Sequence, residues 1–378
     1  MINISDFLSF GGQTLLILLL TSFTCALIGS FLVLRKLSMV SDALAHSVLL
    51  GIVLAFFATK DITSPLLILG AAIFGVVTVY TIEMLSSTGL VKNDDAVGIV
   101  FPLFFSLAVI LITKFARNVH LDTDIVLMGE VIMAPLTTIS YFGITMPKAM
   151  FYVLIAFIVN ILFIIIFFKE LKLTTFDEEF ATIAGFSSAG LFYALMTLSS
   201  FTAVVSFDAV GAILVVSFLI APGGSAYMIT KDLKQMLLVS LAYAAVNTVI
   251  GYFIALKFNV SISGMVATVA GITFFLTFLF NREGLLTSLI IRHQNKKNFR
   301  LELMIMHLGN HEGEANEIEE LGIYSIKNHL MWTQEDVEKR ANVLIKDGLA
   351  ILDNEKGIYR LSEKGFLKYE KIKTAYGM

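Results

Sequence analysis

Residues 11–34 read GGQTLLILLLTSFTCALIGSFLVL, a run without a single charged side chain. About 20 consecutive apolar residues are enough for a helix to cross the hydrocarbon core of a bilayer. Lipid satisfies no backbone polar group, so a single segment that crosses it must be helical. No basic residue precedes Arg35, and the run is longer than the core of a signal peptide. We therefore expect a membrane span that is kept in the mature protein.

The rest of the chain has the same apolar character. Of its 378 residues 57% are hydrophobic and 15% are charged, whereas soluble domains carry about 25% charged residues. The run at 181–199 is rich in Gly, Ser and Thr, which leaves open a broken or re-entrant helix. We expect an all-α polytopic membrane protein with eight or nine transmembrane helices. After the first run, further apolar runs lie at about 43–59, 64–85, 96–113, 149–168, 181–199, 201–222, 235–256 and 262–280.

The composition changes abruptly after Phe280. Residues 292–378 contain 14 Lys/Arg and 14 Asp/Glu. Leu301, Met304, Ile305 and Leu308 form one apolar helical stripe. Thr333 starts a later helix that ends at Gly348, and two β-prone runs follow, 349–352 and 358–361. The prediction is a transmembrane domain at 1–281, a linker at 282–300 and a winged helix-turn-helix domain at 301–378.

Two ionisable residues enter the second apolar run together. Asp42 and His46 lie four residues apart, a spacing that stacks both side chains on one face of a helix. Ionisable groups inside membrane spans are expensive and mark ion pathways. A carboxylate with an imidazole suits Mn, Fe or Zn, whereas Mg or Ca would use oxygen ligands alone. The pair is therefore a candidate metal site in a transport pathway, the alternative being a helix cap and a hydrogen-bonded packing residue.

The chain has no phosphate-binding loop, since no glycine is followed by lysine. We expect no ATP hydrolysis by that route and no enzymatic activity, so active transport would draw its energy from another subunit or an ion gradient. Cys25 is the single cysteine, which excludes a disulfide within the chain.

Four segments, in order, resemble the permease family of ABC importers for manganese, zinc or iron. They are Arg35 to Gly51 with its DALAHSVLLG sequence, DAVGIVF at 95–101, TFDEEFA at 175–181 followed by Gly185, and VGAILVVSFLIAP at 210–222. The resemblance implies a permease subunit in the bacterial cell membrane, carrying a metal ion as substrate and no covalently bound cofactor. Manganese is favoured over iron or zinc. It also implies metal contact by Asp42 and His46.

The same resemblance implies partners. These are a second permease chain in a homodimer or heterodimer, a dimer of ATP-binding cassette subunits, and an extracellular metal-binding lipoprotein. The ATPase-facing segment would include Phe176, Asp177, Glu178, Glu179, Ala181 and Gly185. The tail, which departs from the family pattern, resembles the DNA-binding half of metal-dependent regulators of the diphtheria-toxin-repressor type. Its balanced charge argues against nucleic acid as a partner.

Other candidates are weaker. Asp208 is an acid deep in an apolar run and would line the pathway or hydrogen-bond a neighbouring helix. His307 and His311 lie four apart and would share a regulatory metal, with carboxylates from Glu312, Glu314 or Glu317. The alternative is a solvated helix end. An acidic loop with His120, Asp122, Asp124 and Glu130 would attract cations from outside the cell, and a solvated loop without function explains these residues equally well.

Two other functions compete with the permease. A secondary metal carrier would also place Asp and His within its spans. A membrane-tethered, metal-responsive regulator would use the spans as sensor, although nine spans exceed what a tether needs. Positive charges at Arg35/Lys36 and Lys169/Lys172 would lie on the same side as the C-terminus, which favours a cytoplasmic tail.

Overall fold

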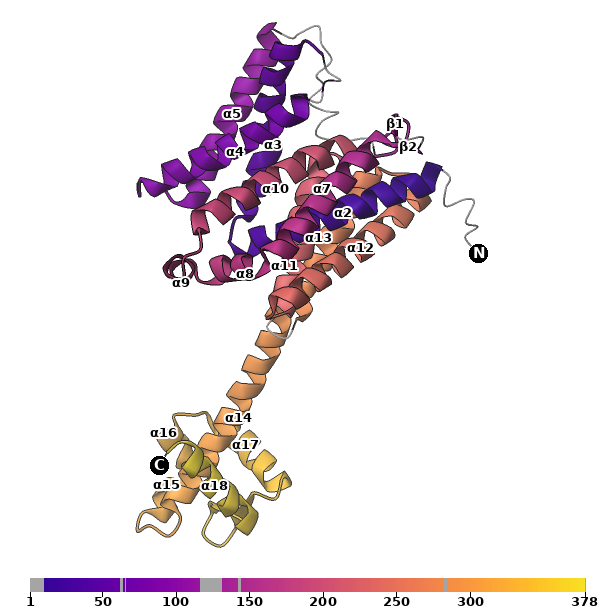
Figure 1. The fold of residues 1–378 in the computed structure, drawn as a ribbon. Coiled ribbons are helices and arrows are strands. Elements are labelled where there is room, and N and C mark those ends of the chain that lie inside the picture. The colour runs from indigo at the N-terminus through magenta and orange to yellow at the C-terminus, as the bar shows by residue number, and fades with distance from the viewer. Residues whose placement is uncertain are drawn as a thin grey trace. The chain divides into compact units, whose positions relative to one another are not determined.

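The computed structural model describes residues 10–61, 64, 66–115, 131–141, 144–281 and 284–377. The chain divides into two compact units, Met1–Arg282 and Glu283–Met378. The first is a bundle of long helices and the second a small domain of helices with one two-stranded sheet (Figure 1).

In the described residues, nine helical stretches are long and apolar enough to cross a membrane. The apolar runs predicted eight or nine spans, and the number found equals the higher of the two. The long helices of the first unit are α2 (Phe10–Leu34), α3 (Ser38–Thr59), α4 (Leu66–Ser87), α5 (Asn93–Phe115), α7 (Lys148–Ile166), α10 (Ser188–Val210), α11 (Ala212–Ile229), α12 (Leu233–Phe258) and α13 (Ile262–Phe280).

The sixth and seventh helices lie elsewhere than expected. The runs at 181–199 and 201–222 predicted a break near residue 200, but α10 continues to Val210. The break comes at Gly211, whose φ of 84° suits a residue without a Cβ. The residues before α10 form two short helices instead, α8 (Phe168–Phe176) and α9 (Glu178–Ile183). The run at 181–199 therefore holds the end of α9, a break at 184–187 and the start of α10.

Helix α2 packs at the centre of the bundle, against α7, α10, α11 and α12 (Figure 1). Small residues permit these contacts. A Cβ on Gly29 would lie 2.0 Å from the backbone oxygen of Leu219 in α11. Between α10 and α4, a Cβ on Gly75 would lie 1.8 Å from Ser200 Oγ. Close approach at small residues is the usual packing of membrane helices, where lipid provides no hydrophobic drive between them.

Between α5 and α7 the chain forms a hairpin of β1 (Thr138–Tyr141) and β2 (Ile144–Pro147). The strands are antiparallel, with Thr138 opposite Pro147. The acidic loop residues His120, Asp122, Asp124 and Glu130 lie outside the described residues.

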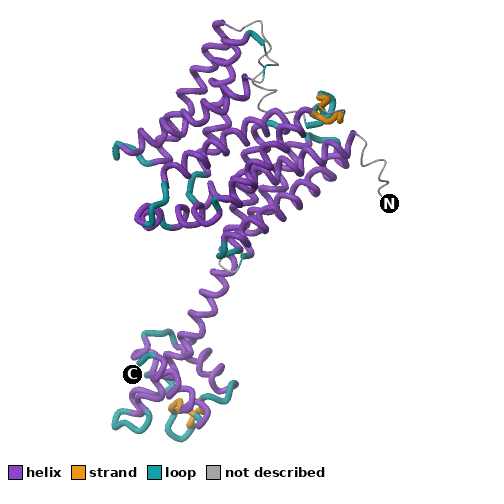
Figure 2. Tube along the Cα trace, in the orientation of Figure 1, coloured by secondary structure: helices purple, strands orange, loops and turns teal. Residues whose placement is uncertain are grey.

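Within its described residues, 284–377, the second unit forms five helices and one hairpin. Figure 2 shows the short strands among the helices of this unit. The segment 282–300, expected to be a linker, is helical from Leu285 onward and has no break at residue 300. The elements are α14 (Leu285–His311), α15 (Glu317–Leu321), α16 (Ile326–Leu330), α17 (Gln334–Lys346), β3 (Ala350–Asp353), β4 (Ile358–Leu361) and α18 (Glu363–Ala375).

Local sequence signals explain these elements. Met304, Ile305 and Leu308 of the predicted stripe are fully buried in the core of this unit. Thr333 caps α17 by accepting a hydrogen bond from the Asp336 amide at 3.2 Å, as the sequence predicted. Gly348 follows α17 with a φ of 69°. The antiparallel β3–β4 pair, with Ala350 opposite Leu361, lies where the two β-prone runs placed it.

Candidate functional site

Asp42 and His46 lie on the second and third turns of α3, where the stacking expected from their spacing is present. His46 Nε2 is 3.8 Å from Asp42 Oδ1. The Asp42 side chain is 48% exposed and the His46 side chain 30% exposed, although most of the helix around them is buried. The imidazole rests against Phe101 and Phe105 of α5, with 5.6 Å between ring centroids in each case. The pair is therefore partly accessible, and its imidazole packs against two aromatic rings of α5.

The carboxylate and imidazole together offer two ligand groups for one borderline metal ion. In the part of the chain that the structure describes, neither group has an ion pair with a third residue. One chain supplies an incomplete coordination sphere here. Its remaining ligands would have to come from water or from another polypeptide.

Asp208 lies near the end of α10 and is exposed, while its neighbours Phe207 and Ala209 are buried. One turn earlier, Val204 belongs to the same buried cluster as Val48 of α3. Asp208 is thus on a helix adjacent to the Asp42–His46 pair. Among the described residues, no ion pair joins it to either.

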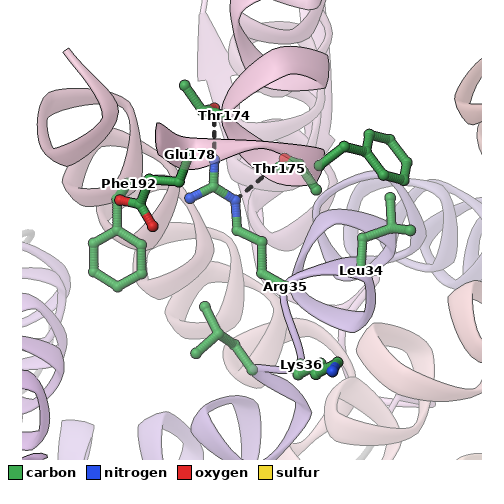
Figure 3. A pocket seen from close by; sticks show the side chains of 9 residues that line it. Leu34, Arg35, Lys36, Thr174, Thr175, Glu178 and Phe192 are labelled. Atoms are coloured by element: carbon green, nitrogen blue, oxygen red, sulfur yellow. Dashed lines mark hydrogen bonds between the residues drawn. The ribbon is translucent and has the colours of Figure 1, made fainter. Parts of the chain in front are cut away.

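The α8–α9 segment lies at the end of the bundle where α2 turns into α3. Arg35, in that turn, donates hydrogen bonds to Thr174 Oγ1 at 2.8 Å and Thr175 Oγ1 at 3.3 Å. These side chains line a cavity of about 370 Å³ (Figure 3). Burial lowers the pKa of the Arg35 guanidinium from its usual range, and the charge of Glu178 acts in the opposite direction. Arg35 therefore ties α8 to the base of α3.

The segment presents both acids and apolar side chains to its surroundings. Asp177 caps α9 by accepting a hydrogen bond from the Phe180 amide at 2.9 Å. Glu178 and Glu179 occupy the first turn, where acids complement the helix dipole. Ala181 is fully buried, and Gly185 adopts a φ of 88° after the helix. The large apolar side chains Phe176, Phe180 and Ile183 are exposed, Ile183 by 84%.

His307 and His311 meet in the second unit, with 4.8 Å between their ring centroids. Of the expected carboxylates, Glu314 contacts His311, but Glu317 instead pairs with Arg360 at 2.8 Å. The carboxylate that approaches both imidazoles is Glu320. Sequence reasoning missed Glu320 and the nearby His329, because they lie on two other short helices whose positions depend on tertiary packing. It also missed the Arg35 contacts with α8.

The fold and these sites define a polytopic helical membrane protein with an ionisable pair on an inner span. The chain belongs to the ABC 3 transport family, whose model matches residues 9–281. It is 40% identical over 263 residues to the manganese transport system membrane protein MntD of Bacillus subtilis, a match that covers 69% of this chain and 89% of that protein.

A second relative extends further. The zinc transport system membrane protein TroD of Treponema pallidum is 38% identical over 338 residues, which covers 89% of this chain and 92% of TroD. An alignment of that length extends beyond the first unit into the second. Among solved structures, PsaBC from Streptococcus pneumoniae in complex with Fab matches with a TM-score of 0.60 and 28% identity. That match covers 74% of this chain and 95% of the PsaBC chain.

Proposed function

We propose that this chain is the membrane permease subunit of an ATP-driven importer for a divalent transition-metal ion, with manganese as the favoured substrate and iron or zinc as alternatives. The supporting observation is the family match across the whole first unit. Two relatives, at 38% and 40% identity, are named as zinc and manganese transport proteins respectively.

The metal would pass the Asp42–His46 pair. The two side chains are adjacent, partly exposed and of the types that manganese, iron and zinc accept. Asp42 and His46 from two permease chains would together provide four ligands. Conduction needs binding that is weak enough to permit release, and an open, partly hydrated site meets that need. Asp208, exposed on the adjacent α10, is a candidate for a neighbouring position in the same pathway.

The ATPase would dock on the α8–α9 segment. Exposed Phe176, Phe180 and Ile183 at the end of the bundle are costly in water and are typical of a protein contact. In this proposal the segment and the C-terminal unit lie in the cytoplasm of a bacterium. A metal-binding lipoprotein outside the cell would deliver the ion. Arg35 would carry movement of the segment to the base of α3.

The second unit supports a winged-helix assignment. We propose a winged helix-turn-helix because helices are followed by the β3–β4 hairpin, which would be the wing, and by a last helix. Fifteen buried hydrophobic side chains among its described residues form a separate core. The match to TroD, which extends into this unit, suggests that the appendage is shared within the family.

Measuring metal accumulation distinguishes the permease from a secondary carrier and from a membrane-tethered regulator. Cells lacking this chain, loaded with Mn, Fe and Zn together and measured by mass spectrometry, should lose uptake of one metal, with manganese expected. Uptake should also stop when the partner ATPase is inactivated and should survive collapse of the proton gradient. Uptake by a secondary carrier would stop when the proton gradient collapses and would survive inactivation of the ATPase. A tethered regulator would change transcription and would transport no metal itself.

A further inference from the structure

Three imidazoles surround one carboxylate where α14, α15 and α16 meet. His307 and His311 project from α14, Glu320 from α15 and His329 from α16. Glu320 Oε2 lies 3.0 Å from His329 Nδ1, 3.8 Å from His307 Nε2 and 4.0 Å from His311 Nε2. We propose that His307, His311 and Glu320 form a binding site for a divalent first-row transition-metal ion, separate from the Asp42–His46 pair.

The distances fit one ion. Imidazole nitrogen and carboxylate oxygen bind zinc at about 2.0–2.2 Å, so two ligands of one ion are at most about 4.4 Å apart. The separations of 3.8 and 4.0 Å between Glu320 Oε2 and the two imidazole nitrogens lie within this limit. One ligand atom from each of the three residues lies within 4.8 Å of the others. Small side-chain rotations are enough to close the remaining gap.

Neighbouring groups orient two of the three ligands. Glu314 Oε2 lies 2.7 Å from His311 Nδ1, which leaves His311 Nε2 on the side of Glu320. A carboxylate on the far nitrogen of an imidazole is the usual partner of a metal-binding histidine. The His329 imidazole orients the Glu320 carboxylate, with 3.0 Å between His329 Nδ1 and Glu320 Oε2. His307 Nε2 lies 3.0 Å from the Glu320 carbonyl oxygen, a contact that metal binding would replace by coordination.

The ligand set selects the class of ion. Two imidazoles with one carboxylate suit Zn, Fe, Mn or Co, whereas Ca and Mg prefer oxygen ligands alone. The side chains of His307, Glu320 and His311 are 11%, 20% and 30% exposed, so an ion and a completing water molecule have access from solvent. Because the ligands come from two separate helices, occupancy would stabilise this packing of the C-terminal unit.

The site belongs to the unit that sequence patterns associate with metal-dependent regulators, but its metal binding does not depend on the proposed transport function. The test therefore uses the full-length chain in detergent carrying Asp42→Ala and His46→Ala, which removes the proposed pathway ligands. Cobalt(II) is titrated and followed by its visible absorption bands, and zinc(II) is titrated by calorimetry. We expect saturable binding of one ion per chain and displacement of cobalt by zinc.

Single substitutions in that background assign the ligands. His307→Gln, His311→Gln and Glu320→Gln should abolish the cobalt bands, whereas Glu314→Gln and His329→Gln should weaken affinity by about 10- to 100-fold. Glu319→Gln, an exposed acid next to Glu320 in α15, should leave binding unchanged. Fluorescence of Trp332, the single tryptophan, checks that each variant's C-terminal unit is folded. Absence of saturable binding to the unsubstituted site, or full binding by a folded His307→Gln/His311→Gln variant, would overturn the proposal.

Discussion

Arg35 donates a hydrogen bond to Thr174 Oγ1 at 2.8 Å, and through this contact the turn that precedes α3 is joined to α8. The residues are 139 positions apart in the chain. Asp42 lies seven positions after Arg35, on α3. The Arg35 contact therefore connects the base of the helix that carries the candidate metal pair with the segment proposed to contact the ATPase.

This connection predicts that Arg35→Met uncouples transport. The substitution keeps much of the aliphatic volume and removes the donors, which leaves the Thr174 and Thr175 hydroxyls without their guanidinium partner. We expect the complex to assemble and hydrolyse ATP while metal uptake falls. Lys36→Met is the control, since Lys36 is exposed in the same turn. Reconstituted vesicles with ATPase and uptake measured on the same sample would detect the uncoupling, and normal uptake by Arg35→Met would contradict it.

Asp42→Ala and His46→Ala should each abolish metal uptake. Each removes one of the two adjacent ligand groups, while partial exposure of both side chains limits the effect on packing. The measurement is uptake of radioactive manganese by cells, with the amount of protein in the membrane quantified in parallel. Asp95→Asn, which alters an exposed acid in the first turn of α5, should transport normally. Wild-type uptake by the double variant would remove the pair from the pathway.

Ile183→Asp should prevent docking of the ATPase. Ile183 is 84% exposed, so the substitution should change the stability of the isolated chain by no more than about 0.5 kcal/mol. A charge at the centre of an apolar contact, by contrast, is strongly unfavourable for binding. Co-purification of the two subunits measures the loss. Leu90→Asp provides the matched control, because Leu90 is 88% exposed in the turn between α4 and α5 and lies outside the α8–α9 segment. Equal loss in both variants would indicate a nonspecific effect.

Much of the fold follows from the sequence because its causes are local. An apolar run of sufficient length leaves a helix as the only solution in lipid, and Thr333 and Gly348 mark the ends of α17 by short-range capping. The break between α10 and α11 escaped prediction because only Gly211 marks it. Asp208, the nearest charged residue, still lies within α10, and apolar residues flank Gly211 directly on both sides.

The candidate sites divide in the same way. Asp42 with His46, and His307 with His311, are each on one helix, where a spacing of four already implies contact. Glu320 and His329 join the second pair only after α15 and α16 pack against α14. Likewise, the contact of Arg35 with Thr174 depends on how α8 lies across the end of the bundle.

Helix packing in the membrane gives a stability prediction. Gly29→Val should destabilise the chain by about 1–3 kcal/mol, the usual cost of overpacking. A Cβ there would lie 2.0 Å from the Leu219 backbone oxygen, and a backbone atom cannot rotate away as a side chain can. Thermal unfolding in detergent should show a lower midpoint. Gly271→Ala in α13 is the control, since a Cβ at that position meets nothing within 4 Å. An unchanged midpoint for Gly29→Val would contradict the α2–α11 contact.

The Glu317–Arg360 pair predicts how acid affects the C-terminal unit. Glu317 is 8% exposed, and the hydrogen bonds from Arg360 hold the pKa of its carboxyl below the usual value. A carboxyl with a lowered pKa in the folded state contributes stability that is complete above its unfolded pKa, about 4.3, and is lost as pH falls through the lower folded pKa. Glu317→Gln should therefore unfold at a lower temperature than wild type at pH 7, and this difference should shrink below about pH 4.

Trp332 makes that measurement possible in the intact chain. It is the single tryptophan, it packs on the core of the C-terminal unit, and the Arg340 guanidinium lies 4.9 Å from the centre of its ring. Its fluorescence therefore reports unfolding of this unit while the membrane helices stay silent. Glu370→Gln, at an exposed acid of α18, should track wild type across the pH range. If Glu317→Gln differs from wild type by the same amount at pH 7 and well below pH 4, the stabilisation does not come from the ionised carboxylate.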